Sequence, residues 1–342
     1  MQAIRTWCAI AAAVCCLVAV HAAVRALAAE PGIPLLRRVQ TIALAGPPGR
    51  LDHLALDPIH HRLFVANMPN SSLDVVDLEQ GKLIRQVPGQ HEIQGIAYAP
   101  DLDLIFVGDG SGSFNIFDGR DYHLLKSLHP GDDCDNVRYD RRTQRAYVIH
   151  APQSLAVIDA KTRKLVKEIP LPAAPESFQL ERGRPRIYLN TPSPSQVAVI
   201  DTEKQAVEKV YPIRNAGANF PMALDEAHHR LLVGCRRPPI LDVLDTESGR
   251  EVASVAIPGD TDDLWYDAQQ GRVYVSCGAG YIAVLRQADA DHYEPLARLE
   301  TQRGARTSLY DPASHRLYLV VPRQNGSRAP EVWVFQTTGE QR

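Results

Sequence analysis

The chain has 342 residues, of which 45% are hydrophobic and 23% are charged, and its formal net charge is −3. These values are typical of a globular protein with one large or two medium domains. The lack of a basic excess argues against nucleic acid as a partner. The 25 prolines and 22 glycines predict a chain rich in turns, with few long helices.

The N-terminus has the layout of a secretory signal peptide over residues 1–28. Arg5 supplies a positive charge, residues 8–20 form an apolar run, and small residues follow, so cleavage is expected after Ala22 or Ala28. The apolar run would rise only ~20 Å as a helix, against a hydrocarbon core of ~30 Å. We therefore expect a periplasmic or secreted protein that keeps no transmembrane anchor once the signal is removed.

Three of the six cysteines lie within this signal segment, and the rest of the chain keeps Cys134, Cys235 and Cys277. An odd number cannot pair completely within one chain, so a disulfide scaffold is not expected. Acidic neighbours of Cys134 should raise the pKa of its thiol and suppress its reactivity. Cys235 and Cys277 occupy equivalent repeat positions, which leaves two alternatives open: buried thiols or joint ligands of a metal.

From residue 35 onward the chain is organised by a repeat of about 42 residues. Each copy has an acidic turn, an Arg-led apolar run, a polar loop and a second run that usually closes on Asp, as in 50–87, 134–169 and 219–255. The turn that ends the first strand recurs every 41 to 44 residues, at Asp57, Ala99, Asp140, Glu181, Asp225, Asp267 and Asp311. Seven such units, each able to form four short strands, predict an all-β fold, a seven-bladed β-propeller with four-stranded antiparallel blades.

The two ends of the repeat region predict how the ring closes. The seventh repeat stops after its third strand, and residues 35–44 match the fourth-strand pattern of residues 82–89. The N-terminal strand should therefore complete the last blade and cover an otherwise open sheet edge. This gives a single propeller domain over 35–338, a short tail at 339–342, and a monomer.

The strand "RLFVAN" at 62–67, followed by "SLDVVDLEQGKLIRQV" at 72–87, resembles the YVTN-type β-propeller repeat family. That repeat pairs an Arg-Leu-Tyr-Val-Thr-Asn strand with a Val-x-Val-Ile-Asp strand. The resemblance covers 35–338 and implies an exported propeller. Members of such a family include scaffolds, binding proteins and a few enzymes.

In propellers of this kind the first strand of each blade lines the axis, so residues at the start of that strand converge at one face. The leading position reads Asp52, Gln94, Asp135, Glu176, Phe220, Asp262 and Arg306. The following position reads His53, Gly95, Asn136, Ser177, Pro221, Asp263 and Thr307. We take as ligand-binding candidates at the channel mouth Asp52, His53, Asp135, Glu176, Asp262, Asp263, Arg306 and Arg236. The alternative is that these acids cap loop amides and stay solvated.

The end of the second strand is also expected on this face. It carries Asn67, Asp109, His150, Thr191, Cys235, Cys277 and Val321, where the resembled family prefers Asn. Clustered carboxylates suit Ca²⁺, whereas nearby His and Cys suit Zn²⁺. A divalent cation, Ca²⁺ or Zn²⁺, is thus the one cofactor that the sequence suggests. Its candidate ligands are Asp52, His53, Asp135, His150 and Asp262.

Arginines supply the opposite charge in blades five to seven. Arg50 enters blade one beside the acids, and four further arginines should face them: Arg236, Arg237, Arg303 and Arg306. An arginine arc opposite an acidic arc would orient a zwitterionic or carboxylate-bearing ligand through bidentate contacts. Solvated surface arginines are the alternative.

No catalytic motif is visible, and no catalytic residue is assigned. The sequence favours a cell-envelope binding or scaffold protein that recognises a small molecule, a peptide or a protein at the channel mouth. The alternative is a metal-assisted enzyme of the lyase or lactonase type, with a cation at the mouth and His53 or His150 moving a proton.

Overall fold

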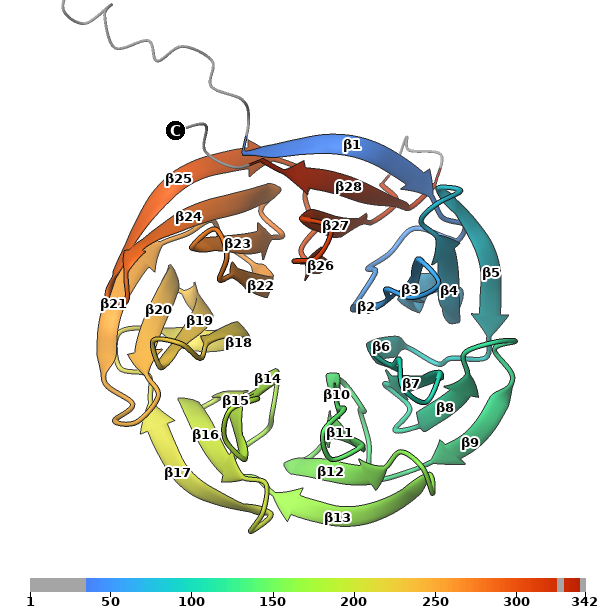
Figure 1. Cartoon of the computed structure of the whole chain (residues 1–342), viewed down its shortest axis with the longest axis horizontal. Coiled ribbons are helices and arrows are strands. Elements are labelled where there is room, and N and C mark those ends of the chain that lie inside the picture. The colour runs from blue at the N-terminus through green and yellow to red at the C-terminus, as the bar shows by residue number, and fades with distance from the viewer. Residues whose placement is uncertain (1–34, 325–328, 339–342) are drawn as a thin grey trace, which may run out of the picture. The chain divides into compact units, whose positions relative to one another are not determined.

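The structure, a computed structural model, describes residues 35–324 and 329–338. These residues form seven four-stranded antiparallel sheets arranged as blades in a ring, which confirms the predicted propeller (Figure 1). The expected signal peptide at 1–28 and the tail at 339–342 lie outside the described residues. Within the described ranges, no helix is both long enough and apolar enough to cross a membrane.

The strands follow the repeat closely. Blades one and two contain β2 (Leu54–Asp57), β3 (Arg62–Asn67), β4 (Ser72–Asp77), β5 (Lys82–Pro88), β6 (Ile93–Ala99), β7 (Leu104–Asp109), β8 (Phe114–Asp118) and β9 (Leu124–Leu128), with the 3₁₀ helix η1 (Met68–Asn70) after β3. Blades three and four contain β10 (Val137–Asp140), β11 (Arg145–His150), β12 (Ser154–Asp159), β13 (Lys164–Pro170), β14 (Phe178–Leu180), β15 (Arg186–Pro192), β16 (Ser195–Asp201) and β17 (Ala206–Pro212).

Blades five and six contain β18 (Gly217–Asp225), β19 (Arg230–Arg237), β20 (Pro239–Asp245), β21 (Glu251–Ala256), β22 (Thr261–Asp267), β23 (Arg272–Cys277), β24 (Tyr281–Asp289) and β25 (His292–Glu300). Blade seven contains β26 (Ser308–Asp311), β27 (Arg316–Val321), β28 (Glu331–Thr337) and β1 (Leu36–Ala43).

Blade seven closes the ring as the sequence predicts. β1 pairs antiparallel with β28, from Leu36 opposite Thr337 to Ala43 opposite Glu331 (Figure 1). Ile42 of β1 is buried and belongs to a hydrophobic cluster shared with blades seven and one. Strand pairing and burial together remove the open edge that blade seven would otherwise expose.

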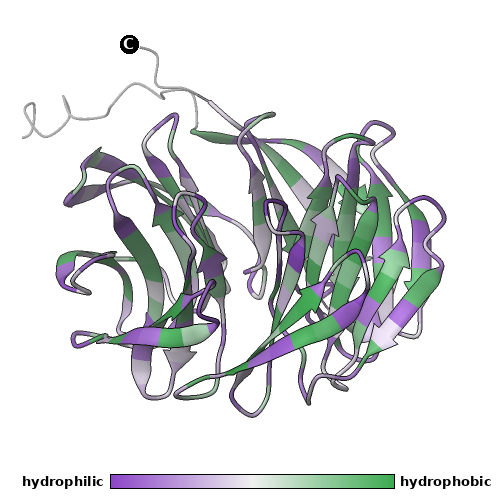
Figure 2. Ribbon diagram, turned by 60° about the horizontal axis from the view of Figure 1, so that its bottom comes forward, coloured by the Kyte–Doolittle hydropathy of each residue, from purple (hydrophilic) through white to green (hydrophobic). Residues whose placement is uncertain are grey.

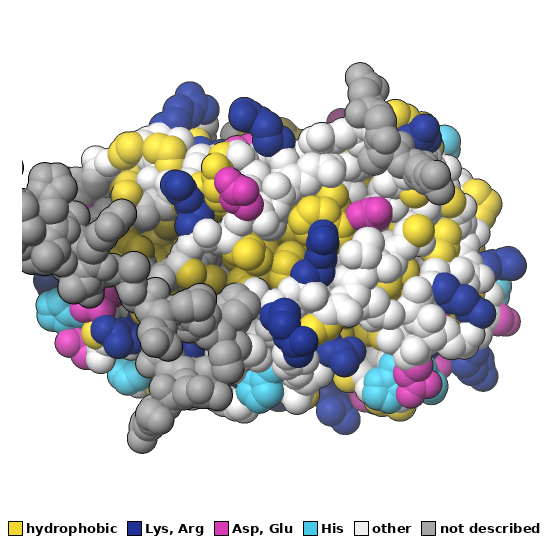
Figure 3. Space-filling model, turned by 90° about the horizontal axis from the view of Figure 1, so that it is seen from above, with side chains coloured by type: hydrophobic (Ala, Val, Ile, Leu, Met, Phe, Trp, Pro, Cys, Tyr) yellow, Lys and Arg dark blue, Asp and Glu magenta, His cyan; other side chains and the backbone are white. Residues whose placement is uncertain are grey.

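The hydrophobic core lies between neighbouring blades. Phe106 of β7 and Val148 of β11, for example, belong to one buried cluster. The three inner strands of each blade are mostly buried, whereas the outer strand alternates, as in β17, because one of its faces meets solvent (Figure 2). Seen from the side of β1, the outer wall shows apolar atoms among scattered Lys and Arg side chains (Figure 3), and Val39 is 41% exposed there.

The recurrent turn acids are used by the fold itself. The Asp57 carboxylate accepts hydrogen bonds from the backbone N–H groups of Ile59 and His60, at 3.0 and 3.2 Å. Asp77, at the end of β4, accepts the same kind of bonds from Glu79 and Gln80. Such Asx turns explain why Asp recurs at strand ends. The acids that precede the innermost strands, such as Asp52 and Asp135, line a cavity instead of capping a turn.

Candidate functional site: the channel mouth

A cavity of about 240 Å³ lies where the chain enters the innermost strand of each blade. We call it the mouth cavity. Its lining residues are Arg50, Asp52, His53, Gln94, Asp133, Asp135, Glu176, Phe220, Arg236, Asp262 and Arg306. All seven residues of the leading repeat position are among them. The structure thus brings together every predicted ligand-binding candidate except Asp263.

The following repeat position ties adjacent blades together beneath this cavity. The Asn136 side-chain amide donates to the backbone oxygen of Glu176 at 2.9 Å, which joins blades three and four. Thr307 likewise donates to the backbone oxygen of Leu51 at 3.2 Å, across the seam between blades seven and one. At Gly95 a β-carbon would lie 2.0 Å from the Asp135 backbone oxygen, so only glycine permits this approach. The acidic loop of blade three is therefore held rigidly.

The mouth arginines are engaged by carboxylates of the protein. Arg50 pairs with Asp52, and Arg236 pairs with Asp262. Arg306 contacts Asp262 at 2.7 Å and Asp260 at 2.9 Å. Of the predicted arginine arc, Arg236 and Arg306 line the mouth cavity, and both are paired with carboxylates of the protein, as Arg50 is. This geometry corrects the idea that free guanidinium groups oppose an acidic arc.

Arg236 also stacks on Phe220, with its guanidinium carbon 3.5 Å from the ring centroid. The pKa of the Asp262 carboxyl is nevertheless raised to about 6, because burial outweighs the attraction of Arg306 and Arg236.

Two carboxylates of the mouth cavity, those of Asp135 and Glu176, form no ion pair with an arginine or a lysine of the described residues. Within residues 35–324 and 329–338, no arginine or lysine forms an ion pair with Asp135 or Glu176, and one Asp135 oxygen is buried without a hydrogen bond. Burial, together with the charge of Asp52, raises the pKa of Asp135 to about 7. Burial and the neighbouring Asp135 raise the pKa of Glu176 well above its usual value. The side of blades three and four is therefore an acidic surface that no arginine or lysine of the described residues neutralises by an ion pair.

His53 lies beside these acids. Its Nε2 atom is 3.8 Å from carboxylate oxygens of Asp52 and Asp135, and its Nδ1 atom is 3.8 Å from Asp263. Burial alone would lower the pKa of this imidazole, but the nearby carboxylates of Asp263, Asp52 and Asp135 raise it to about 10. His53 is thus a cation at neutral pH and not a free base.

Asp263 does not line the mouth cavity, contrary to the prediction. It lines a separate cavity of about 300 Å³ in the channel, which His53 also lines. The Asp263 carboxylate accepts a hydrogen bond from the backbone N–H of Ser308 at 2.7 Å. Its role is to hold blade seven and to support His53.

The seven residues at the repeat position that ends the second strand do not line the mouth cavity, contrary to expectation. His150 is buried, its Nε2 atom is 2.8 Å from Glu168, and its Nδ1 atom is 2.9 Å from the Ala151 carbonyl oxygen. It lines a neighbouring cavity of about 90 Å³, with Asp135 and Glu176 on the wall. Both ring nitrogens are engaged, so His150 offers no ligand atom to a cation in the mouth cavity. Asn67 is similarly turned toward Asp74, at 2.8 Å.

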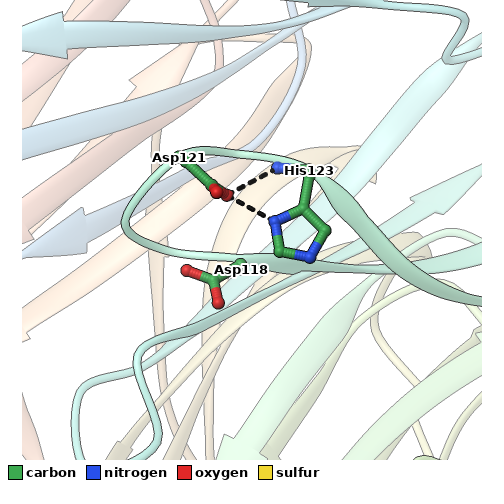
Figure 4. A group of neighbouring side chains, drawn as sticks. All are labelled: Asp118, Asp121 and His123. Atoms are coloured by element: carbon green, nitrogen blue, oxygen red, sulfur yellow. Dashed lines mark hydrogen bonds and ion pairs between the residues drawn. The ribbon is translucent and has the colours of Figure 1, made fainter.

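The predicted metal ligands do not form a compact donor set. In the described part of the chain, the donor atoms that lie within 4.8 Å of one another belong to Asp118, Asp121 and His123 (Figure 4). That group sits in a hairpin turn of blade two, where Asp118 pairs with Arg120 at 2.6 Å and His123 bonds Asp121. Its contacts are those of a surface turn. At the mouth, Asp52 and Asp262 are already neutralised by arginine, so these residues fit a multivalent cation poorly.

The three cysteines of the propeller are free and fully buried. Cys235 and Cys277 belong to different hydrophobic clusters, which does not support joint metal ligation. Burial, more than the neighbouring acids, raises the pKa of the Cys134 thiol to about 12. Burial likewise raises the pKa of the other two thiols to about 12.

These thiols should be unreactive in the native state. In a chain that lacks residues 1–28, we expect no rapid reaction with a disulfide reagent such as DTNB, and three reactive thiols after denaturation, because the thiolate is both scarce and inaccessible. Absorbance of the released thiolate measures both values. Rapid native reaction of even one thiol would contradict the burial described above.

Some mouth residues were not named as candidates from the sequence. Asp133 contacts Gln94, which donates to it at 2.7 Å, and Asp260 pairs with Arg306. The signal was present, since both acids belong to the loops "GDDCDN" (131–136) and "GDTDD" (259–263). Asp133 and Asp260 precede the leading repeat position in these loops, so the repeat alignment did not select them.

Comparisons with known proteins identify the architecture. The chain superposes on hydrazine synthase from Kuenenia stuttgartiensis with a TM-score of 0.76 and 16% sequence identity, covering 87% of this chain and 98% of that chain. At this identity the similarity shows the propeller fold alone. Similar folds occur in 1839 chains of solved structures, so the fold does not select a function. No family model and no curated protein sequence matches the chain.

Proposed function

We propose that the protein is an exported, YVTN-type cell-envelope propeller that acts as a binding or scaffold protein. Its mouth cavity would receive a cationic group of a small-molecule, peptide or protein ligand. The supporting observation is that Asp135 and Glu176 line this cavity without an arginine or lysine partner in the described ranges. His53 is the nearest protein cation, 3.8 Å from Asp135, but it is shared with Asp52 and Asp263. Partly buried carboxylates that are only partly balanced are costly, and an ammonium or guanidinium group of a ligand would supply the missing charge.

The raised pKa values make such binding dependent on pH. Asp135 titrates at about 7 in the free protein, and it must be ionised to attract a cation. The cation in turn lowers the pKa of the carboxyl, so binding releases protons. Affinity should therefore increase from pH 6 to pH 8.

A metal-assisted enzyme of the lyase or lactonase type is the second candidate at this place. The dispersed donor atoms and the charged state of His53 weigh against it. Asp135, with a pKa of about 7, is the better proton-transfer group, because catalytic acids and bases work best with a pKa near the ambient pH. Binding is the function that the geometry supports better.

Calorimetric titration with spermidine and agmatine tests the proposal. The double substitution Asp135→Asn and Glu176→Gln should weaken binding at pH 8 by about tenfold or more, because each lost partner of a charged hydrogen bond is worth that much. The matched control is Glu79→Gln with Glu203→Gln, which removes two exposed acids elsewhere and should leave the affinity unchanged.

Equal affinities of the two double variants would contradict the proposal. A thermal shift with Ca²⁺ or Zn²⁺ that disappears in the mouth variant, without any polyamine binding, would support the metal alternative instead.

A further inference from the structure

A second large cavity lies between blades three and four. Its volume is about 810 Å³, and residues 138–142 and 179–182 line it. Asp135 and Glu176 of the mouth cavity precede β10 and β14, whereas this cavity is formed where the same two strands end and turn. The two sites therefore lie at opposite ends of the same strands. We call the second one the arginine groove.

Four arginines line the groove: Arg138, Arg141, Arg142 and Arg182. Arg141 and Arg182 are exposed, and in the described part of the chain neither forms an ion pair with a carboxylate. Arg142 approaches Asp140 at 3.7 Å, which is longer than a hydrogen bond. Most of the positive charge on the groove wall is therefore available to a ligand.

The acids beside these arginines are occupied. Asp140 accepts hydrogen bonds from the Arg142 backbone N–H at 2.9 Å and from the Thr143 hydroxyl at 2.6 Å. Glu181 is buried, and its carboxylate accepts hydrogen bonds from Arg184 at 2.5 Å and from the Tyr188 hydroxyl at 3.0 Å.

Glu226, which lies next to the groove lining, accepts the backbone N–H groups of Arg182 and Gly183. These contacts leave little carboxylate capacity to pair with the groove arginines.

Arg138 marks the inner end of the groove. Its half-buried side chain lines both the groove and the channel cavity below the mouth. The guanidinium donates to the Val137 carbonyl oxygen at 2.9 Å and lies 5.6 Å from the Phe178 ring centroid. Four further N–H donors of this group thus have no protein acceptor among the described residues. Burial lowers the pKa of Arg138 below its usual value and outweighs the attraction of Asp263 and Asp135.

We propose that the arginine groove binds a small polyanion that carries carboxylate or phosphate groups, with one oxyanion at Arg138 and another at the exposed arginines. Guanidinium groups match such oxyanions in a bidentate manner. The volume lies within the range of small-molecule sites, about 300–1,000 Å³. This site is distinct from the cation site proposed at the mouth and has different lining residues.

Titration calorimetry of the purified protein with citrate and with inorganic phosphate tests the site, in buffers of equal ionic strength. We expect saturable binding of one anion per chain. Arg141→Gln with Arg182→Gln should weaken it by about tenfold or more, since two charged hydrogen-bond donors are lost. The matched control, Arg85→Gln with Arg250→Gln, removes two exposed arginines from other blades and should change the affinity by less than about twofold.

Each outcome bears on the site. Tighter binding of citrate supports a carboxylate ligand, and tighter binding of phosphate supports a phosphorylated one. Arg138→Gln should also weaken binding. The double variant Arg141→Gln with Arg182→Gln is decisive, because substitution of two exposed residues leaves the core intact. Non-saturable binding, or an equal loss in the control pair, would overturn the proposal. The mouth variant Asp135→Asn with Glu176→Gln should not weaken anion binding, because it removes negative charge that attracts Arg138, and this separates the site from the proposed function.

Discussion

Replacing Arg62 with leucine is expected to lower the free energy of unfolding by about 3 to 5 kcal/mol. The Arg62 side chain is almost completely buried and donates to the Asp57 carboxylate at 2.8 and 2.6 Å. It also reaches the Gly119 carbonyl oxygen and the Tyr122 hydroxyl, which links blade one to blade two. Removal of the guanidinium leaves the fully buried Asp57 without its main counter-charge, and this is what makes the loss large.

The repeat provides a matched control for this substitution. Arg145 begins β11 as Arg62 begins β3, but its ion pair with Asp159 is partly solvated, with side chains 30% and 26% exposed. Arg145→Leu should therefore cost less than about 1 kcal/mol. Urea unfolding followed by circular dichroism measures both variants. Similar losses at the two positions would show that burial of the pair is not the deciding factor.

The second large effect is on how stability depends on pH. The pKa of Asp135 is raised from 3.8 to about 7, so the folded state pays a cost to ionise this carboxyl. The cost is absent below pH 4, develops as the pH rises toward 7, and persists above it, because the unfolded chain ionises at the lower value. Asp135→Asn removes the cost. The variant should gain more than about 1.4 kcal/mol over the wild type between pH 4 and pH 8, since one pKa unit has that value.

The imidazole of His53 should affect the stability over a different pH range. Its pKa is raised from 6.5 to about 10, so its stabilising contribution is complete below pH 6.5 and is lost as the pH rises through 10. His53→Gln should accordingly destabilise the protein most at pH 6 and least above pH 10. Chemical unfolding at a series of pH values measures both variants. A free-energy difference that is independent of pH for either one would mean that its carboxylate or imidazole titrates normally.

The number of blades and the closure of the ring could be predicted from the sequence, because they depend on local patterns. Strand alternation and Asx turns act over a few residues, and both recur with the repeat. The prediction that 35–44 supplies the last strand succeeded for the same reason, since its pattern is that of an outer strand. The leading ring position could be predicted too, because equivalent residues of equivalent blades must converge on one axis.

The state of each charge at the mouth could not be predicted in this way. Arg236 and Arg306 were expected to face a ligand, but both contact Asp262, and Arg236 reaches it from the neighbouring blade. His150 was expected near the mouth, but it contacts Glu168 on the outer strand of its own blade. A repeat alignment predicts the position of a residue along its strand. The direction of its side chain depends on which charged or polar group lies nearest in the folded chain.

Short-range patterns that recur seven times specify the backbone, so the propeller, the closing strand and the ring of leading residues follow from the sequence. Which ionisable groups are neutralised depends on contacts that form only in the folded chain. The tertiary structure left Asp135 and Glu176 without an arginine or lysine partner in the described ranges at one end of β10 and β14, and it left Arg141 and Arg182 of the groove without a carboxylate partner there at the other end. Long side chains reach across blades to charges distant in the sequence, and electrostatic attraction over a few ångströms, rather than repeat position, selects their partners.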